Sequence, residues 1–321
     1  MKKSIVCLLV CLILVGSLGF AAGAKESSQP RVAVLLPGTV EFFSVQKRGL
    51  DKAADDFGLK LIYADAEWDS GKQLNQVENF VASGVDMVLL CAADNLALLP
   101  TVQLCKEAGI PLMTFTNVLG KDPDGKLDGV ISYVGINDFV QGVKQGEMAE
   151  ELLGDRPANI VLIEGEPGTS AQRFRSQGFE SIAAKHPHWT IVYRQAINGW
   201  SKELALAAVE AFLQTGTPVD LISAQWHAGA AAAAIAIEEA GYDIAKGKKT
   251  FVTGLEYAKE IQPMIISGAV DATSYASIVD MGYTVVELAA KHLKGEKIPQ
   301  VVSIEPHIVT KANVNQFEPE M

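Results

Sequence analysis

The residues of this chain that could carry acid–base or nucleophilic chemistry do not form a known catalytic motif. The sequence contains no G-x-S-x-G, H-E-x-x-H, C-x-x-C or G-x-x-x-x-G-K-[ST] segment. Glu256 and His227 could form an acid–base pair, but neither a nucleophile nor a metal motif accompanies them. We therefore predict that the protein is not an enzyme and that it has no cofactor and no metal site.

Two predicted loops carry side chains or backbone groups that could meet a ligand. His227 follows Trp226 in one of them, where it could contact a ligand, or could instead cap the next helix or support a residue that contacts the ligand, and these interpretations stay open. Gly165 and Gly168 frame the other loop, which leads into a predicted helix and could present amide hydrogens. The Lys-Ser or Lys-Thr partner of a phosphate cradle is missing there, so a phosphate site is not favoured.

From residue 31 onward, short β-branched runs alternate with amphipathic stretches, which is typical of βαβ units and parallel sheets. A helix is expected to begin with Ser70-Gly71-Lys72-Gln73, because S-x-x-Q is a capping-box pattern. A second series starts near Asp138, and Glu-Ala-Gly ends a predicted helix in both series, at 107–109 and 239–241. The predicted fold is therefore α/β, with two Rossmann-like, doubly wound lobes. Strands are expected at 32–36, 60–63, 87–90, 111–114, 130–134, 159–163, 190–193, 221–223 and 250–253, and the helices of the second series at 138–153, 171–185, 201–213 and 228–240.

Ligands of doubly wound sheets bind beyond the carboxyl ends of the strands. The loops that matter are therefore those that follow the predicted strands. If the two lobes face each other, all of these loops border one cleft. They cover residues 38–43, 65–69, 91–95, 116–118, 164–175, 196–200, 225–227 and 255–258.

The N-terminal segment and the charge balance indicate an exported protein. Lys2 and Lys3 precede an apolar stretch, and small residues follow up to Ala24, so residues 1–24 are predicted to be a cleavable signal peptide. The chain has 38 acidic and 27 basic residues and no basic stripe, which disfavours nucleic-acid binding. Cys91 and Cys105 are predicted to be buried free thiols, because one ends a strand and the other lies late in the following helix.

Several segments, in this order along the chain, resemble type I periplasmic binding proteins of the ribose-binding-protein-like cluster that serves ABC sugar importers. The resemblance extends over nearly all of the chain after the signal peptide. It rests on Phe42-Phe43, on Gly168-Thr169-Ser170-Ala171 with Arg175 and Gly178-Phe179, on Gly254, on Gly268 to Thr273 with Gly282, and on Leu293-Lys294-Gly295-Glu296-Lys297.

The resemblance implies two lobes joined by a three-segment hinge, near 137–138, 276–277 and 305–306. The N-terminal lobe would comprise residues 31–137 and 277–305, and the C-terminal lobe residues 138–276 and 306–321. It also implies a monomer in the periplasm that closes over its ligand and delivers it to ABC permease and ATPase subunits.

The resemblance further implies a site for a small polyhydroxylated ligand, with aromatic rings on the sugar faces and an arginine donating to its oxygens. This chain departs from the family pattern at Thr116-Asn117, where relatives carry Asp-Arg, and at Trp226, where they carry Asn. Glu256 replaces the usual Asp. These changes make ribose itself a poor expectation. The candidate ligand-binding residues are Phe42, Phe43, Asn117, Arg175, Trp200, Trp226, Glu256, Thr116, Asn137, Asn95, Gln225 and His227.

Two functions fit this sequence. The first is a periplasmic solute-binding protein of an ABC importer, which takes a sugar, deoxysugar or sugar alcohol. The alternative is a periplasmic sensor of the same fold, which binds an autoinducer-like or chemotaxis ligand and signals to a receptor or histidine kinase. The sequence does not separate them, because both use the same cleft.

Overall fold

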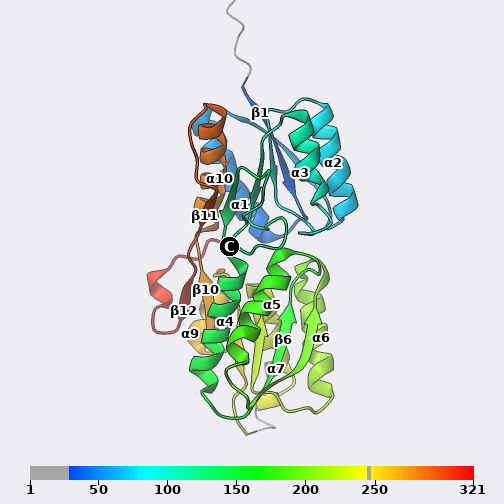
Figure 1. Ribbon diagram of the computed structural model, residues 1–321. Helices are drawn as coiled ribbons and strands as arrows, with labels where there is room; N and C mark the ends of the chain where they lie inside the picture. Colours follow the sequence, from blue (N-terminus) through cyan, green and yellow to red (C-terminus); the bar gives the residue numbers. More distant parts are fainter. Residues whose placement is uncertain (1–28, 244–246) are drawn as a thin grey trace, which may run out of the picture.

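The computed structural model describes residues 29–243 and 247–321, which fold into two lobes stacked end to end (Figure 1). The predicted signal peptide, residues 1–24, lies outside the described residues. Each lobe is built on a six-stranded sheet. The C-terminus lies at the waist between the lobes (Figure 1), where Lys259 donates its backbone N–H to the carbonyl of Met321. The predicted α/β fold of two doubly wound lobes is confirmed.

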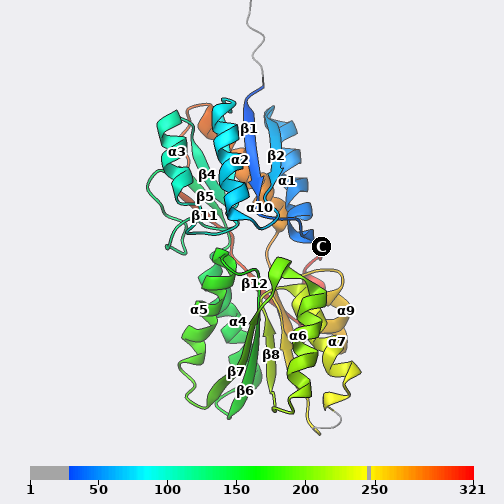
Figure 2. The same cartoon turned by 90° about the vertical axis from the view of Figure 1, so that its right-hand side faces the viewer.

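The first sheet is parallel throughout. One of its edge strands comes from the C-terminal part of the chain and pairs with β5. Helices α1 and α10 pack together on one face, and α2 and α3 on the other (Figure 2). In spatial order, the strands are β11 (Val301–Ser303), β5 (Ser132–Gly135), β4 (Leu112–Phe115), β3 (Met87–Leu90), β1 (Arg31–Leu36) and β2 (Lys60–Asp65). The helices are α1 (Glu41–Phe57), α2 (Ser70–Ala82), α3 (Pro100–Ala108) and α10 (Ile278–Leu293).

The second sheet is parallel except for the antiparallel pair β10–β12. Helices α4 and α5 cover one face, and α6, α7 and α9 cover the other (Figure 2). In spatial order, the strands are β12 (His307–Thr310), β10 (Ala272–Tyr275), β9 (Phe251–Thr253), β8 (Leu221–Ala224), β6 (Ala158–Glu164) and β7 (Trp189–Ala196). The helices are α4 (Asp138–Leu153), α5 (Ser170–Ala183), α6 (Lys202–Gln214), α7 (His227–Glu239) and α9 (Ile261–Ser267), with 3-10 turns η1 (Asn198–Trp200) and η2 (Val314–Gln316).

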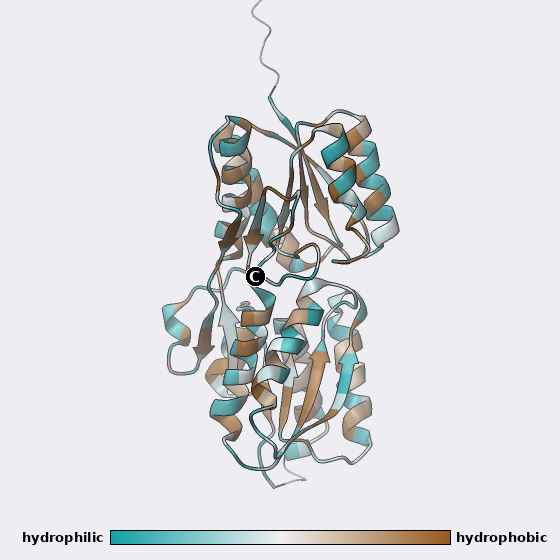
Figure 3. Ribbon diagram, in the orientation of Figure 1, coloured by the Kyte–Doolittle hydropathy of each residue, from teal (hydrophilic) through white to brown (hydrophobic). Residues whose placement is uncertain are grey.

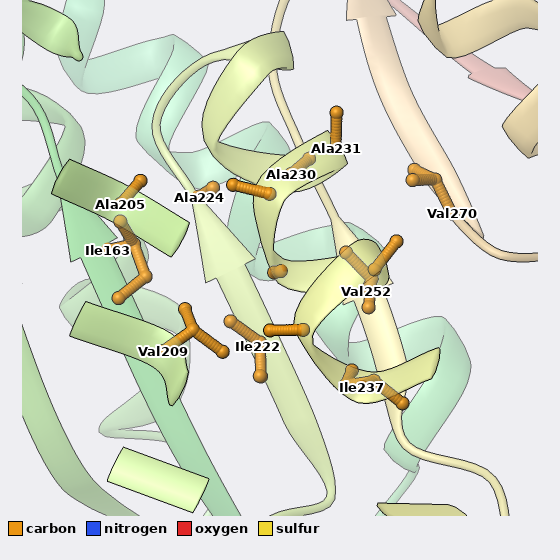
Figure 4. Close-up of a cluster of buried hydrophobic side chains, with 14 of the residues drawn as sticks. Ile163, Ala205, Val209, Ile222, Ala224, Ala230, Ala231, Ile237, Val252 and Val270 are labelled. Carbon is orange, nitrogen blue, oxygen red and sulfur yellow. The ribbon is translucent and has the colours of Figure 1, made fainter. Parts of the chain in front are cut away.

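Alternation along the strands explains why helices cover both faces. In β1, Val32 and Val34 join the core under α1 and α10, while Ala33 and Leu35 join the core under α2 and α3. Apolar residues accordingly concentrate along the strands and hydrophilic residues on the outer sides of the helices (Figure 3). The second lobe repeats this arrangement, with a core between β6, β8, β9 and helices α6 and α7 (Figure 4).

Side-chain caps fix where several helices begin. Asn137, Thr169, Ser201 and Ser277 each accept a hydrogen bond from the backbone N–H three residues later. The predicted capping box at Ser70 is wrong: Asp69 caps α2 by accepting from the Lys72 N–H. The Gln73 side chain is instead buried, where it donates to the Cys91 carbonyl and accepts from the Ala93 N–H.

The chain passes between the lobes three times. It leaves the first sheet after β5 and enters α4, returns from β10 into α10, and leaves again between β11 and β12. Because both lobes direct the carboxyl ends of their parallel strands toward this waist, the loops that follow the strands meet there.

Candidate functional site

A cavity of about 220 Å³ lies between the loops of the two lobes. Nine of the twelve sequence-predicted residues line it: Phe42, Phe43, Thr116, Asn117, Arg175, Trp200, Trp226, His227 and Glu256. Val40, Glu41, Trp68, Ala171, Lys202 and Ala228 complete the lining. Aromatic rings, one arginine and carboxylates from separate lobes thus converge on one space.

Aromatic rings form both walls of the cavity. On the first lobe, Phe42 and Phe43 at the start of α1 meet edge to face at 5.4 Å, and Trp68 lies 6.2 Å from Phe43. On the second lobe, Trp200 and Trp226 meet edge to face at 5.5 Å. Such rings can stack on the C–H faces of a small ring-shaped ligand.

Each of the three tryptophans that line the cavity packs against a glycine. A Cβ atom at any of these glycines would lie inside the contact distance of the indole, so only glycine leaves room for the ring. The indole positions are therefore set by glycines as well as by the tryptophans themselves. The closest approaches would be 2.3 Å for Gly38 to Trp68, 2.0 Å for Gly165 to Trp200 and 2.7 Å for Gly229 to Trp226.

Arg175 is held at the cavity by a buried network. Its Nε donates to Asp138 at 3.0 Å, a second nitrogen donates to the Gln225 carbonyl at 2.6 Å, and its guanidinium lies 5.6 Å from the Trp200 ring. Burial raises the pKa of the Asp138 carboxyl, while the Arg175 charge opposes that rise. The guanidinium thus keeps most of its N–H groups available while its position is fixed from behind.

His227 stands between carboxylates of both lobes. Its Nδ1 lies 3.0 Å from Glu256 Oε2 within the second lobe, and its Nε2 lies 3.8 Å from Glu41 Oε2 of the first lobe. The backbone of Glu256 has φ 71°, a left-handed conformation that places this side chain off the end of β9. The structure places His227 in the cavity wall, at the first position of α7, whose N-cap residue is Trp226.

Thr116 and Asn117 direct their hydrogen-bond donors into the first lobe. Thr116 Oγ1 exchanges hydrogen bonds with the Gln46 carboxamide at 2.8 and 3.2 Å. Asn117 Nδ2 donates to the Ala92 carbonyl at 2.8 Å. Both residues line the cavity, but these polar groups already have partners in their own lobe.

The other three predicted site residues, Asn95, Asn137 and Gln225, are not among the residues that line the cavity. Asn137 caps α4 and donates to Asp124, so it holds the first crossover between the lobes. Gln225 accepts from the Gly165 N–H and donates to the Gln172 carbonyl and the Ser176 hydroxyl. Asn95 donates from its side chain to the Gly120 carbonyl. Their polar groups stabilise loops around the site.

The lobes also touch beside the cavity. The Val118 N–H of the first lobe donates to Ser170 Oγ of the second at 3.0 Å, and Arg173 pairs with Asp94 at 3.3 Å. The Asn95 N–H donates to the Gly168 carbonyl at 3.3 Å. These contacts hold the loops of both lobes around the same space.

A family model described as "Periplasmic binding protein domain" matches residues 32–297. This chain belongs to that family. The resemblance found in the sequence is thereby confirmed. The prediction that the protein binds a solute and is not an enzyme is confirmed as well. The family also implies a periplasmic or extracellular location.

Members of the family with known names or structures span most of this chain. The ribose import binding protein of Bacillus subtilis (strain 168) is 29% identical over 265 residues, which cover 82% of this chain and 81% of that protein. The xylitol-binding protein of Mycolicibacterium smegmatis is 26% identical, over 68% of this chain and 60% of that protein. A solute-binding protein of Bacillus halodurans C-125, solved with bound myo-inositol, superimposes with a TM-score of 0.83 at 25% identity, covering 92% of this chain and all of that one.

The sequence interpretation missed Trp68, Glu41 and Lys202 as lining residues. Trp68 belongs to the loop 65–69, which was expected at the cleft, so an indole in that loop was the available signal. Glu41 precedes the Phe42-Phe43 pair, and Lys202 begins α6, where it pairs with Glu260. Neither has a sequence signature that separates it from an ordinary surface charge.

Cys91 and Cys105 are both free and buried, as predicted. Among residues 29–243 and 247–321, no group of His, Cys, Asp and Glu side chains is arranged to hold a metal ion. No helix in the same ranges is long and apolar enough to cross a membrane.

Proposed function

We propose that this protein is the periplasmic receptor of an ABC importer and that it binds a small sugar, deoxysugar or sugar alcohol in the cavity between its lobes. The observation that carries the proposal is the composition of that cavity. Rings on both walls can cover the faces of a small polyol, while Arg175 and Glu256 can bind its hydroxyl groups. The ribose, xylitol and myo-inositol named for its relatives are ligands of this size and chemistry.

Closure over the ligand follows from the division of the site between the lobes. We infer that residues 31–137 with 277–305 move against residues 138–276 with 306–321. Phe43 and Arg175 belong to different bodies in this division, so a ligand can touch both only when the lobes are together. A ligand favours closure by the free energy of those extra contacts. The closed form then presents both lobes at once to the permease.

The protein acts as a monomer that hands its ligand, unchanged, to the permease and ATPase subunits. Charged residues that line the cavity have ionic partners within this chain: Arg175 pairs with Asp138, Lys202 with Glu260 and Glu41 with His227, which supports a site complete in one copy. Residues 1–24 are cleaved during export.

A thermal-shift screen against pentoses, hexoses, deoxysugars, polyols and nucleosides tests the function. A ligand at 100 times its dissociation constant adds about 2.7 kcal/mol to the free energy of unfolding, a shift of several degrees. Trp200→Ala should reduce the shift, and Leu204→Ala, an exposed side chain on α6 that is not among the lining residues, should retain it in full. If no sugar or polyol raises the melting temperature of the wild-type protein, the proposed function is wrong.

A further inference from the structure

The indole nitrogen of Trp226 is a buried donor without an acceptor. The side chain is 4% exposed, it lines the cavity, and Nε1 has no hydrogen-bond partner among the described residues. Its benzene ring stands against Gly229, so the pyrrole edge that carries Nε1 faces away from that glycine. Buried polar groups in native proteins are almost always paired. Since Trp226 lines the cavity and its N–H has no partner among the described residues, a ligand that packs beside this ring can supply the missing acceptor.

The other available polar groups lie on the same side of the cavity. Arg175 uses two of its five N–H groups, toward Asp138 and the Gln225 carbonyl. Glu256 Oε2 faces His227, while Oε1 lies 3.9 Å from the Arg175 guanidinium and accepts no hydrogen bond from the described residues. All of these groups belong to the second lobe, so they form one polar wall.

The opposite wall, on the first lobe, offers few hydrogen-bond partners to a hydroxyl group. Phe42, Phe43 and Trp68 form most of it, together with Val40. Its buried side-chain donors, on Thr116 and Asn117, are bonded within the first lobe, which leaves the Asn117 amide oxygen as an acceptor. Glu41 is the remaining charge, and its side chain is 59% exposed at the mouth.

We propose that the site selects a polyol with one hydroxylated edge and one edge that carries C–H or methyl groups, such as a 6-deoxyhexose. Trp226 Nε1 acts as a specificity-determining donor to an oxygen on the hydroxylated edge. The deoxygenated edge lies against the aromatic wall of the first lobe. This inference rests on the proposed function and narrows its ligand class.

The physical reason is the cost of burying an unpaired hydroxyl. A hydroxyl pressed against the rings of Phe42, Phe43 or Trp68 loses its bonds to water and gains none. A hydrogen or methyl group at the same place removes apolar surface from water instead. An apolar pocket rejects an added hydroxyl by up to about 100-fold, so we expect a preference of about 10- to 100-fold for the deoxy sugar.

Calorimetric titration of the protein with two matched pairs tests the ligand class. The pairs are D-fucose with D-galactose and L-rhamnose with L-mannose, and within each pair the sugars differ only in the 6-hydroxyl. We expect at least one deoxy sugar to bind at least about tenfold more tightly than its partner. Equal or tighter binding of both parent hexoses overturns the proposal, and so does the absence of binding by all four sugars. The proposed function would survive either result if another polyol of the wider screen binds.

Trp226→Phe tests the donor separately, because it keeps an aromatic ring and removes Nε1. It should weaken binding of the tighter sugar of the four by about 2- to 12-fold, the range for one neutral hydrogen bond. Trp189→Phe is the matched control, since Trp189 Nε1 donates to the Gly154 carbonyl and Trp189 is not among the lining residues. It should leave affinity unchanged. If the Trp226→Phe protein, folded as judged by its melting curve, binds as the wild type does, Trp226 is not a donor to the ligand.

Discussion

Gly165→Ala should weaken ligand binding although Gly165 carries no side chain of its own. The added Cβ would lie 2.0 Å from both Cη2 and Cζ3 of Trp200, well inside contact distance. Gly165 has no positive φ, so alanine fits its backbone and the conflict is confined to the indole. Trp200 belongs to a short 3-10 turn and is only partly buried, so its ring can move away. The expected change is therefore a displaced wall of the cavity, with little loss of unliganded stability.

The size of the effect follows from overpacking. Forcing extra atoms into a packed contact costs about 1–3 kcal/mol. If the ligand must press Trp200 back into place, this cost appears in binding, and the affinity falls by about 5- to 150-fold. Gly71→Ala is the matched control, because a Cβ there approaches only Asp69 Oδ1, at 3.2 Å, in the first turn of α2. It should bind as the wild type does.

A double-mutant cycle shows whether Gly165 acts through Trp200. Calorimetric titration with the tightest ligand of the polyol screen gives the affinities of Gly165→Ala, Trp200→Ala and the double variant. If the glycine only makes room for the indole, the double variant should bind like Trp200→Ala alone. Additive losses, or full affinity in Gly165→Ala, would refute this account of how the wall is positioned.

Three further outcomes follow from the structure. Ser170→Ala removes the acceptor for the Val118 N–H across the cleft and should weaken ligand binding by about 2- to 12-fold in a titration, the range for one hydrogen bond. Because burial raises the pKa of both thiols, that of Cys105 to about 11, Cys91 and Cys105 should react with an aromatic disulfide reagent only after unfolding. Burial acts to raise the pKa of Asp220, but hydrogen bonds from a lysine and a backbone N–H outweigh it and lower that pKa. Ionised Asp220 thus stabilises the folded protein above the ordinary carboxyl pKa, and Asp220→Asn should lower the free energy of unfolding by about 1–3 kcal/mol at pH 7. Denaturant titrations should show this difference between wild type and variant disappear as the pH falls through the lowered pKa.

Local patterns predicted the elements well because periodicity and caps act over a few residues. The helix predicted at 138–153 has those bounds in the structure, since Asn137 caps one end and Gly154 follows the other. Gly109 and Gly241 end their helices with φ of 67° and 56°, as their positions indicated. The capping box failed at Ser70 because Asp69, one residue earlier, supplies a better acceptor, which a four-residue motif does not weigh.

The site was predictable in outline and less so in detail. Loops after parallel strands must meet at one edge, so the cavity was expected among them, and Phe42, Phe43 and Arg175 lie in its wall. The roles of Asn137 and Gln225 depend on partners far away in sequence, and no local pattern reports those contacts. The packing of Trp68 against Gly38 and of Trp200 against Gly165 likewise depends on contacts between segments that are far apart in sequence.

A crystal structure of the protein with the tightest ligand of the polyol screen tests the central claim most directly. We expect the ligand ring in the cavity between the lobes, in contact with aromatic side chains of both lobes and with the Arg175 guanidinium within hydrogen-bond distance of its oxygens. A ligand bound elsewhere on either lobe, with the cavity between the lobes unoccupied, would contradict it.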